Sequence, residues 1–290
     1  MKEGTVLLIG RPNVGKSTFV NNLIGQKIAI TSPKPQTTRF PIKGRYEDER
    51  GRIIFIDTPG IMGKVQDSMS QKINKRTFDS INNSVDAVVY MIDHTRRRDF
   101  EEAKVLGTVR KIDKPKFLLV NKVDIPEPTY LPQYTYLEDE FPNVYAISAL
   151  ENKHIKPFLD ALFAVLPEKT VADTTAENET NYPLLNLDSS TFIGELIREK
   201  IFLKMGKEIP YTTAVLVDDI TERNDTLTFI KARILTTNDR YKKMIIGEGG
   251  RKIKEMGSMA RKEIELAIHK KVYLELTVET DPHWQETYYK

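Results

Sequence analysis

A glycine-containing stretch near the N-terminus could do phosphate chemistry. Residues 10–18 follow directly on the apolar run 6–9 and open a stretch of helical character. A glycine loop between a strand and a helix can turn successive backbone N–H groups inward, which makes a cradle for a polyphosphate. In such a loop Lys16 reaches the β- and γ-phosphates, and Ser17 supplies a hydroxyl ligand for Mg²⁺. The candidate nucleotide contacts here are Gly10, Arg11, Pro12, Asn13, Val14, Gly15, Lys16, Ser17 and Thr18.

A second motif would complete the metal and γ-phosphate site. The apolar run 53–56 is followed by Asp57, Thr58, Pro59 and Gly60. Asp57 would hold Mg²⁺ through water, and the Gly60 amide could contact the γ-phosphate because glycine permits close backbone approach. In isolation this pattern is an ordinary exit from a strand, but the upstream phosphate loop favours the functional interpretation.

The loop 32–39 lies between these two motifs and contains two prolines and adjacent threonines. We expect one hydroxyl here to close over the γ-phosphate and to add a protein oxygen to Mg²⁺. Thr38 is preferred, although spacing alone leaves Thr37 open. A loop that is ordered by this contact and released on hydrolysis acts as a switch.

A third motif selects the base. The apolar run 117–120 is followed by Asn121, Lys122 and Asp124. The Asp124 carboxylate can accept hydrogen bonds from the ring N1–H and the 2-amino group of guanine, which adenine does not offer in that arrangement. A buried carboxylate left unpaired is costly, so the motif predicts strong discrimination against adenine. Asn121 suits the opposite edge of the base, and Lys122 would lay its stem along the nucleotide.

These motifs need a scaffold that brings strand ends together. Strands alternate with helices over residues 2–166, which predicts an α/β fold with a doubly wound, mainly parallel sheet. The ligand of such a sheet lies at the carboxyl ends of its strands, where the motifs fall. The last strand ends in Ser148, Ala149 and Leu150, and the N–H groups of Ala149 and Leu150 could face the base oxygen.

Length and composition place the motifs in a larger chain. The 290 residues suggest two domains. The absence of cysteine excludes disulfides and thiolate metal sites. We expect no signal peptide, and no apolar run approaches the roughly 20 residues of a membrane span. We expect a nucleotide domain over residues 1–168, a linker over 169–188 and a second domain over 189–290.

The second domain has the element order α-β-β-α-α-β of a small α+β module. Two of its helical stretches are joined by Gly247, Glu248, Gly249 and Gly250, the Gly-x-x-Gly pattern of a KH fold, which clamps about four nucleotides of a single strand. Residues 240–262 contain eight Lys or Arg and two Glu. The sequence therefore predicts an RNA clamp. Its candidate contacts are Ile245, Ile246, Gly247, Glu248, Gly249, Gly250, Arg251, Lys252 and Lys254.

Together these motifs resemble the Era family of bacterial GTPases over nearly the whole chain. The matching stretches are Gly10–Thr18, Pro35–Arg39, Asp57–Gly60, Asn121–Asp124, Ser148–Leu150 and Ile245–Gly257. The resemblance implies a P-loop GTPase domain followed by a KH domain of type II character. It also implies binding of GTP and GDP, binding of the 3′ end of small-subunit (16S) ribosomal RNA, and a role in maturation of the small (30S) subunit.

The resemblance adds expectations about cofactors and location. Asn13 occupies a loop position that binds K⁺ in some related GTPases, so K⁺ is a candidate beside Mg²⁺. The expected metal contacts are Ser17, Thr38 and Asp57, and the expected catalytic groups are Asn13, Lys16, Thr38 and Gly60. A cytoplasmic monomer is expected, with peripheral contact at the cell membrane as known for some members. Glu248 departs from the family pattern, in which a cation is common.

Three alternatives stay open at this point. The chain could be a GTPase of another class with an incidental second domain, or a binding module whose first domain is catalytically silent. A small-molecule phosphotransferase could use the same phosphate loop, but residues 121–124 speak against it.

Overall fold

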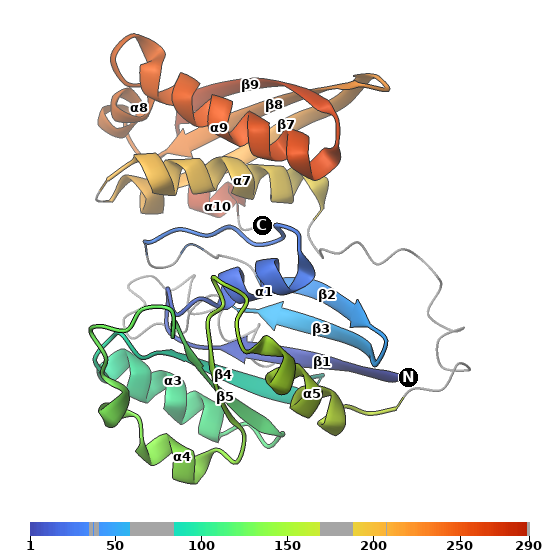
Figure 1. Ribbon diagram of the computed structural model, residues 1–290. Coiled ribbons are helices and arrows are strands. Elements are labelled where there is room, and N and C mark those ends of the chain that lie inside the picture. The colour runs from blue at the N-terminus through green and yellow to red at the C-terminus, as the bar shows by residue number, and fades with distance from the viewer. Residues whose placement is uncertain (35–36, 38–40, 59–83, 169–187, 207, 289–290) are drawn as a thin grey trace. The chain divides into compact units, whose positions relative to one another are not determined.

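The computed structural model divides the chain into two compact units, which Figure 1 shows with their elements labelled. It describes residues 1–34, 37, 41–58, 84–168, 188–206 and 208–288, with 287 and 288 by their backbone alone. The first unit comprises residues 1–31 and 35–186, and the second comprises residues 32–34 and 187–290. No helix within the described ranges is both long and apolar enough to cross a bilayer.

The first unit contains a six-stranded sheet in the order β2-β3-β1-β4-β5-β6. Its elements in chain order are β1 (Lys2–Ile9), α1 (Lys16–Ile24), β2 (Ile42–Asp48), β3 (Gly51–Asp57), β4 (Ala87–Asp93), α3 (Phe100–Arg110), β5 (Lys116–Asn121), a 3₁₀ turn (Leu131–Gln133), α4 (Tyr136–Glu140), β6 (Val144–Ile147) and α5 (Ile155–Val165). All neighbouring strands are parallel except β2 and β3. This confirms the mainly parallel sheet. The antiparallel edge strand β2 was not predicted, because its sequence is mostly polar.

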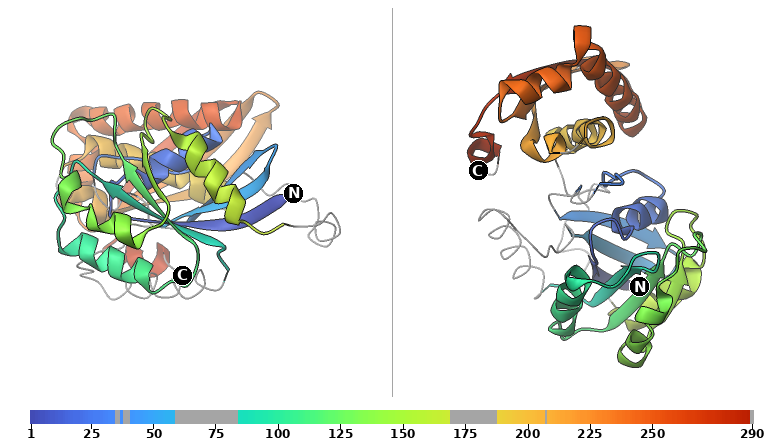
Figure 2. Two further views of the ribbon diagram at one scale, coloured as in Figure 1. Left: turned by 60° about the horizontal axis from the view of Figure 1, so that its bottom comes forward. Right: turned by 90° about the vertical axis from the view of Figure 1, so that its left-hand side faces the viewer.

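Helices lie on both sides of this sheet (Figure 2), and buried apolar side chains line its two faces. On one face Phe19 of α1 and Phe158 of α5 meet with ring centroids 5.9 Å apart. On the other face Val105 and Leu106 of α3 form a buried cluster with Leu137 of α4. Strand β4 is buried along its whole length, as expected for a central parallel strand. The two layers hold the strand ends in a fixed register.

The second unit contains a three-stranded sheet in the order β7-β8-β9. Its elements are α7 (Ser189–Lys204), a 3₁₀ turn (Ile209–Thr212), β7 (Thr213–Asn224), β8 (Leu227–Thr236), α8 (Asp239–Ile246), a 3₁₀ turn (Glu248–Gly250), α9 (Arg251–Ile268), β9 (Lys271–Thr280) and α10 (Trp284–Tyr288). Strands β7 and β8 are antiparallel, whereas β8 and β9 are parallel. The predicted element order is confirmed, and α10 is an addition to it. Helix α9 buries Met256, Ala260 and Ile264, which are spaced by one turn.

Candidate nucleotide and RNA sites

The phosphate loop connects β1 to α1, and its shape depends on left-handed backbone positions. Helix α1 begins at Lys16. Gly15, directly before it, has φ +107°, and a Cβ there would lie 2.2 Å from Asn121 Nδ2. Asn13 also has a positive φ, +64°. Only glycine fits at position 15, and such turns let neighbouring N–H groups face one concavity.

The cation of the phosphate loop lies inside the loop. Lys16 Nζ donates to the carbonyl oxygens of Gly10 at 3.0 Å and Arg11 at 3.1 Å. The residue is only 6% exposed, and burial lowers the pKa of its ammonium group. A phosphate oxygen would be a stronger partner than these carbonyls, because it carries a full negative charge.

Two further side chains fit a hydrated divalent cation. Ser17 Oγ donates to Asp57 Oδ2 at 2.6 Å. Among the residues that the structure describes, Asp57 Oδ1 is buried and has no hydrogen-bond partner. Burial raises the pKa of this carboxyl group. A buried carboxylate oxygen beside a serine hydroxyl suits Mg²⁺, which takes few protein oxygens and retains waters.

Residues 121–124, here called the guanine loop, are hydrogen-bonded to the phosphate loop and to the loop that follows β6. Asn121 Nδ2 donates to the carbonyl oxygen of Val14 at 2.7 Å, and Asn121 Oδ1 accepts from the N–H of Ala149 at 2.9 Å. Ser148 Oγ donates to Asp124 Oδ1 at 2.6 Å and so orients that carboxylate. The structure therefore brings together three of the predicted segments. It differs from the expectation for Ala149, since Asn121 takes the N–H that was expected to face the base.

One residue of this site escaped the sequence analysis. Asn22 of α1 donates through Nδ2 to the carbonyl oxygens of Ala149 at 2.7 Å and Leu150 at 3.0 Å. These bonds tie the last loop to the helix that follows the phosphate loop. An asparagine within a helix gives no sequence signal for such a partner, which is 127 residues away.

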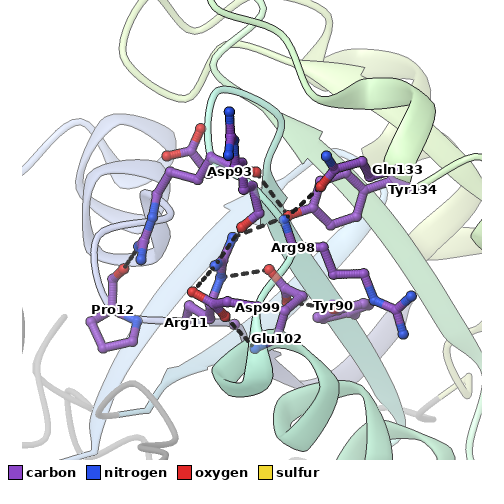
Figure 3. A network of polar contacts seen from close by, with 12 residues as sticks. Arg11, Pro12, Tyr90, Asp93, Arg98, Asp99, Glu102, Gln133 and Tyr134 are labelled. Carbon is purple, nitrogen blue, oxygen red and sulfur yellow. Dashed lines mark hydrogen bonds and ion pairs between the residues drawn. The ribbon is translucent and has the colours of Figure 1, made fainter.

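The Arg11 side chain turns away from the loop into a buried polar network (Figure 3). Its Nε lies 2.6 Å from Glu102 Oε2, and its NH1 lies 2.9 Å from Asp99 Oδ2. Its NH2 donates to the hydroxyl of Tyr134 at 3.1 Å, while the Tyr90 hydroxyl donates to Glu102 at 2.5 Å. Burial would lower the pKa of Arg11, but the neighbouring carboxylates raise it. Any contact of Arg11 with a nucleotide would therefore come from its backbone.

Three predicted contacts, Thr38, Pro59 and Gly60, lie outside the described residues. Thr37 is described and is only 7% exposed, so the choice between Thr37 and Thr38 as a metal ligand stays open. Thr58 Oγ1 donates to a carbonyl oxygen of β1 at 2.8 Å. That bond leaves the Thr58 backbone as its candidate contact.

The second site is the glycine loop between α8 and α9. Gly247, Gly249 and Gly250 have φ values of +73°, +57° and +76°. A Cβ at Gly249 or Gly250 would meet no atom within 4 Å. Helix α9 begins at Arg251, and the Gly250 N-cap provides no side chain to bond the first N–H groups. The loop thus presents bare backbone that a sugar-phosphate chain could approach.

Three exposed cations follow the loop on the first turns of α9: Arg251, Lys252 and Lys254. Arg251 pairs with Glu248, and both side chains are largely exposed, at 76% and 87%. Because both partners are solvated, this pair contributes little to stability and leaves the guanidinium accessible. The cations are therefore placed to hold phosphates.

The two isoleucines before this loop differ in how far their side chains are buried. Ile245 is fully buried in the domain, which contradicts the expectation that its side chain contacts RNA. Ile246 is half-buried at the last residue of α8. The apolar run gave no sign of which side chain faces the core, so only Ile246 stays a candidate base contact.

Comparisons with known proteins match both units of the chain. A family model described as 50S ribosome-binding GTPase matches residues 5–122, and a model described as KH domain matches residues 208–285. The GTPase Era of Halothermothrix orenii is 35% identical and aligns with 98% of this chain and 95% of its own length. The GTPase Era of Trichlorobacter lovleyi is 37% identical, with coverage of 98% and 94%.

A solved structure gives the same result in three dimensions. It is described as Era in complex with MgGDPNP and nucleotides 1506–1542 of 16S ribosomal RNA. It is 31% identical to this chain, with a TM-score of 0.88 and coverage of 98% of this chain and 95% of that one. The similarity thus extends over both units.

Proposed function

This chain belongs to the Era family of GTPases, and on that premise we propose that it is a GTP-hydrolysing switch that binds the 3′ region of small-subunit ribosomal RNA. In this role it assists assembly of the small subunit. The observation that supports the proposal most is the pairing, in one chain, of a braced nucleotide site with an open glycine loop on a KH domain. We assign nucleotide binding to residues 1–168, connection to 169–188 and RNA binding to 189–290.

In the proposed nucleotide site, backbone N–H groups of the loop 10–18 hold the phosphates, except at Pro12, which has no N–H. Lys16 exchanges its carbonyl partners for phosphate oxygens. Asp124, oriented by Ser148, accepts from the guanine edge. Ser17, and Asp57 through water, would hold Mg²⁺, which would supply positive charge to the phosphates during transfer. K⁺ at Asn13 is a further proposal, and turnover measured in potassium against sodium buffer tests it.

The hydrolytic part is tested by steady-state turnover with GTP and ATP. Lys16→Ala is expected to lower GTP turnover by roughly 100- to 1,000-fold, because it removes a charge that acts on the transferring phosphoryl group. Lys104→Ala, an exposed lysine of α3, is the matched control. Turnover that does not depend on Lys16, or a preference for ATP, would contradict a GTPase and favour a silent module or another phosphotransferase.

The RNA part is tested by affinity for an oligonucleotide with the sequence of the 16S rRNA 3′ end. Gly250→Asp places a carboxylate where the phosphates are proposed to lie, and we expect about a tenfold or greater loss, since like charges brought together cost several kcal/mol. Gly206→Asp makes the same change at an exposed glycine with no neighbour near its Cβ. An RNA affinity that Gly250→Asp leaves unchanged would favour a GTPase of another class with an incidental second domain.

The proposed partners extend to the assembled small subunit. Co-sedimentation of the full chain with 30S particles tests that contact, and co-sedimentation with anionic vesicles tests peripheral binding to a membrane. We propose a cytoplasmic monomer, and light scattering at several protein concentrations would reveal any self-association.

A further inference from the structure

The loop between β4 and α3, residues 94–99, contacts two of the proposed nucleotide loops. Its residues form no recognisable motif in the sequence. The structure places it directly after Asp93, the last residue of β4, whose register partner on β5 is Asn121 of the guanine loop. Asp93 Oδ1 accepts from both the N–H and the hydroxyl of Thr95, at 2.9 and 2.6 Å, which fixes the first turn. The β4–α3 loop therefore leaves the sheet in a defined conformation.

At one end of this loop, His94 holds the backbone of the guanine loop. Its Nε2 lies 3.0 Å from the carbonyl oxygen of Lys122, and its Nδ1 lies 3.1 Å from Thr129 Oγ1. A carbonyl oxygen can only accept, so Nε2 carries a proton and donates to Lys122, while Nδ1 forms a hydrogen bond with the Thr129 hydroxyl. His94 is only 7% exposed. The imidazole is thus fixed on both of its nitrogens.

The residue that His94 holds has an unfavourable backbone. Lys122 has φ +73°, a left-handed conformation that residues with a Cβ rarely adopt. Its Nζ donates to the fully buried Asp93 Oδ2 at 2.6 Å. Two consecutive residues of the β4 end therefore hold Lys122, one by its carbonyl and one by its ammonium group. Lys122 lies between Asn121 and Asp124, so its backbone sets where those two side chains point.

At the other end, Arg96 holds the backbone of the phosphate loop. Its NH1 donates to the carbonyl oxygen of Pro12 at 3.0 Å. The peptide that contains this carbonyl leads into Asn13, which has φ +64°. The next residue, Arg97, offers its carbonyl oxygen to Arg11 NH1 at 3.1 Å. In each of the two nucleotide loops, a side chain of the β4–α3 loop thus bonds to a backbone carbonyl oxygen. That carbonyl belongs either to a residue with a left-handed backbone (Lys122) or to the residue before one (Pro12).

We propose that the β4–α3 loop is a positioning element for the nucleotide, in which His94 fixes base recognition and Arg96 fixes the phosphate loop. The inference deepens the proposed function and rests on it. Because the two side chains hold different loops, they affect different parts of the ligand. Loss of the His94 contact weakens guanine recognition, whereas loss of the Arg96 contact weakens binding through the phosphates whatever the base.

The test compares dissociation constants for GDP and inosine diphosphate, which lacks the 2-amino group. His94→Gln keeps an N–H donor where Nε2 stands, whereas His94→Asn reaches Thr129 but not Lys122. We expect His94→Asn to bind GDP roughly three- to tenfold more weakly, the usual effect of one lost hydrogen bond, and to lose less for inosine diphosphate. The ratio between the two ligands therefore shrinks, and His94→Gln restores it.

The phosphate end gives the complementary result. Arg96→Ala should weaken GDP and inosine diphosphate by the same factor and leave their ratio unchanged. Arg97→Ala is the matched control, because the Arg97 guanidinium lies over the Tyr130 ring at 5.3 Å and not on a nucleotide loop. It should bind both ligands as the wild type does.

Two outcomes overturn the inference. One is a His94→Asn variant with unchanged affinities, and the other is a variant that loses both ligands by the same factor, as general destabilisation would cause. Thr129→Val removes the hydroxyl that orients the imidazole without touching His94, and it should shrink the ratio in the same direction. If instead the wild type fails to bind GDP, the proposed function is wrong and not merely the role of this loop.

Discussion

The two glycine loops of this protein differ in what surrounds them. In the phosphate loop, a side chain at Gly15 would collide with Asn121, which itself bonds to two loops. In the glycine loop 247–250 between α8 and α9, here called the KH loop, a side chain at Gly249 or Gly250 would meet open space. The phosphate loop at Gly15 is thus specified by packing and by backbone conformation together, whereas Gly249 and Gly250 are specified by conformation alone.

The charged groups beside the two loops differ in the same way. Next to the phosphate loop, Arg11 and Glu102 form a fully buried ion pair. Next to the KH loop, Arg251 and Glu248 pair on the surface. A small rigid ligand that binds in one orientation requires a fixed site. A flexible RNA strand can be bound by accessible backbone groups and solvent-exposed cations. The comparison teaches that the same residue type serves rigidity in one unit and access in the other.

The largest difference should come from glycine substitutions. Gly15→Ala combines left-handed strain with loss of the Asn121 brace, each about 2 kcal/mol, so we expect GDP affinity to fall about 1,000-fold. Gly107→Ala in α3, where a Cβ meets no atom within 4 Å, is the control and should not alter affinity. Calorimetric titration measures the GDP affinity of both variants. A Gly15→Ala variant that binds GDP as the wild type does would show that packing at Gly15 is not required.

The buried pair should matter next. Glu102→Gln leaves the Arg11 guanidinium without its fully buried partner, and we expect the free energy of unfolding to fall by about 3 kcal/mol. Glu138→Gln, an exposed carboxylate of α4, should change it by less than about 0.5 kcal/mol. Urea unfolding of the full chain reports both changes. Similar values for the two variants would mean that the network near the phosphate loop is no more than surface charge.

Gly249→Ala should have a smaller effect on folding. Only the left-handed φ opposes a methyl group there, so we expect about 1–1.5 kcal/mol of lost stability. Thermal unfolding measures this loss. A loss as large as that predicted for Glu102→Gln would show hidden packing around the KH loop and would erase the contrast between the two glycines.

A partly buried ion pair in the nucleotide unit gives a pH effect. The Arg50 guanidinium bonds to Asp48 and lowers the pKa of that carboxyl group to about 2. Because the folded pKa lies below the unfolded value, the stabilisation is present above about pH 4 and is lost as pH falls towards 2. With solvent screening it amounts to about 1 kcal/mol. Between pH 5 and pH 2 the free energy of unfolding should therefore fall by about 1 kcal/mol less in Asp48→Asn than in the wild type. Urea unfolding at several pH values measures this difference, and identical pH dependences of the two proteins would disprove the contribution.

The smallest effect concerns the exposed pair. Glu248→Gln removes a negative charge from the KH loop and frees Arg251, so RNA affinity should rise about threefold at low salt. Stability should stay within about 0.5 kcal/mol of the wild type. Filter binding at several salt concentrations checks this. A decrease in affinity would show that Glu248 contacts the RNA itself.

Much of this architecture could be predicted because local pattern and spacing determine it. Continuous apolar runs marked the central strands, and the strand ends carried the nucleotide motifs. Lys16 and Asp57 could be paired because parallel strands present their carboxyl ends on one edge. The KH loop could be predicted because three glycines stand between two helical stretches.

The remaining features depend on contacts between distant segments. No local sequence pattern indicates that His94 contacts Lys122. Nor does one indicate that Arg11 pairs with Glu102, 91 positions further along the chain. The burial of Ile245 rather than Ile246 depends on how α8 rests in its unit. The antiparallel β2 forms because β3 offers an edge, although its own residues are mostly polar.

A GTP-hydrolysing switch that binds RNA, as proposed here, requires that the state of the nucleotide site changes the affinity of the RNA site. The direct measurement is the affinity of the full chain for the 16S rRNA 3′-end oligonucleotide when loaded with GDP and with a non-hydrolysable GTP analogue. The account predicts different affinities, with the same ratio recovered when the two nucleotides are titrated with and without RNA. Equal RNA affinities in the two nucleotide states would contradict it.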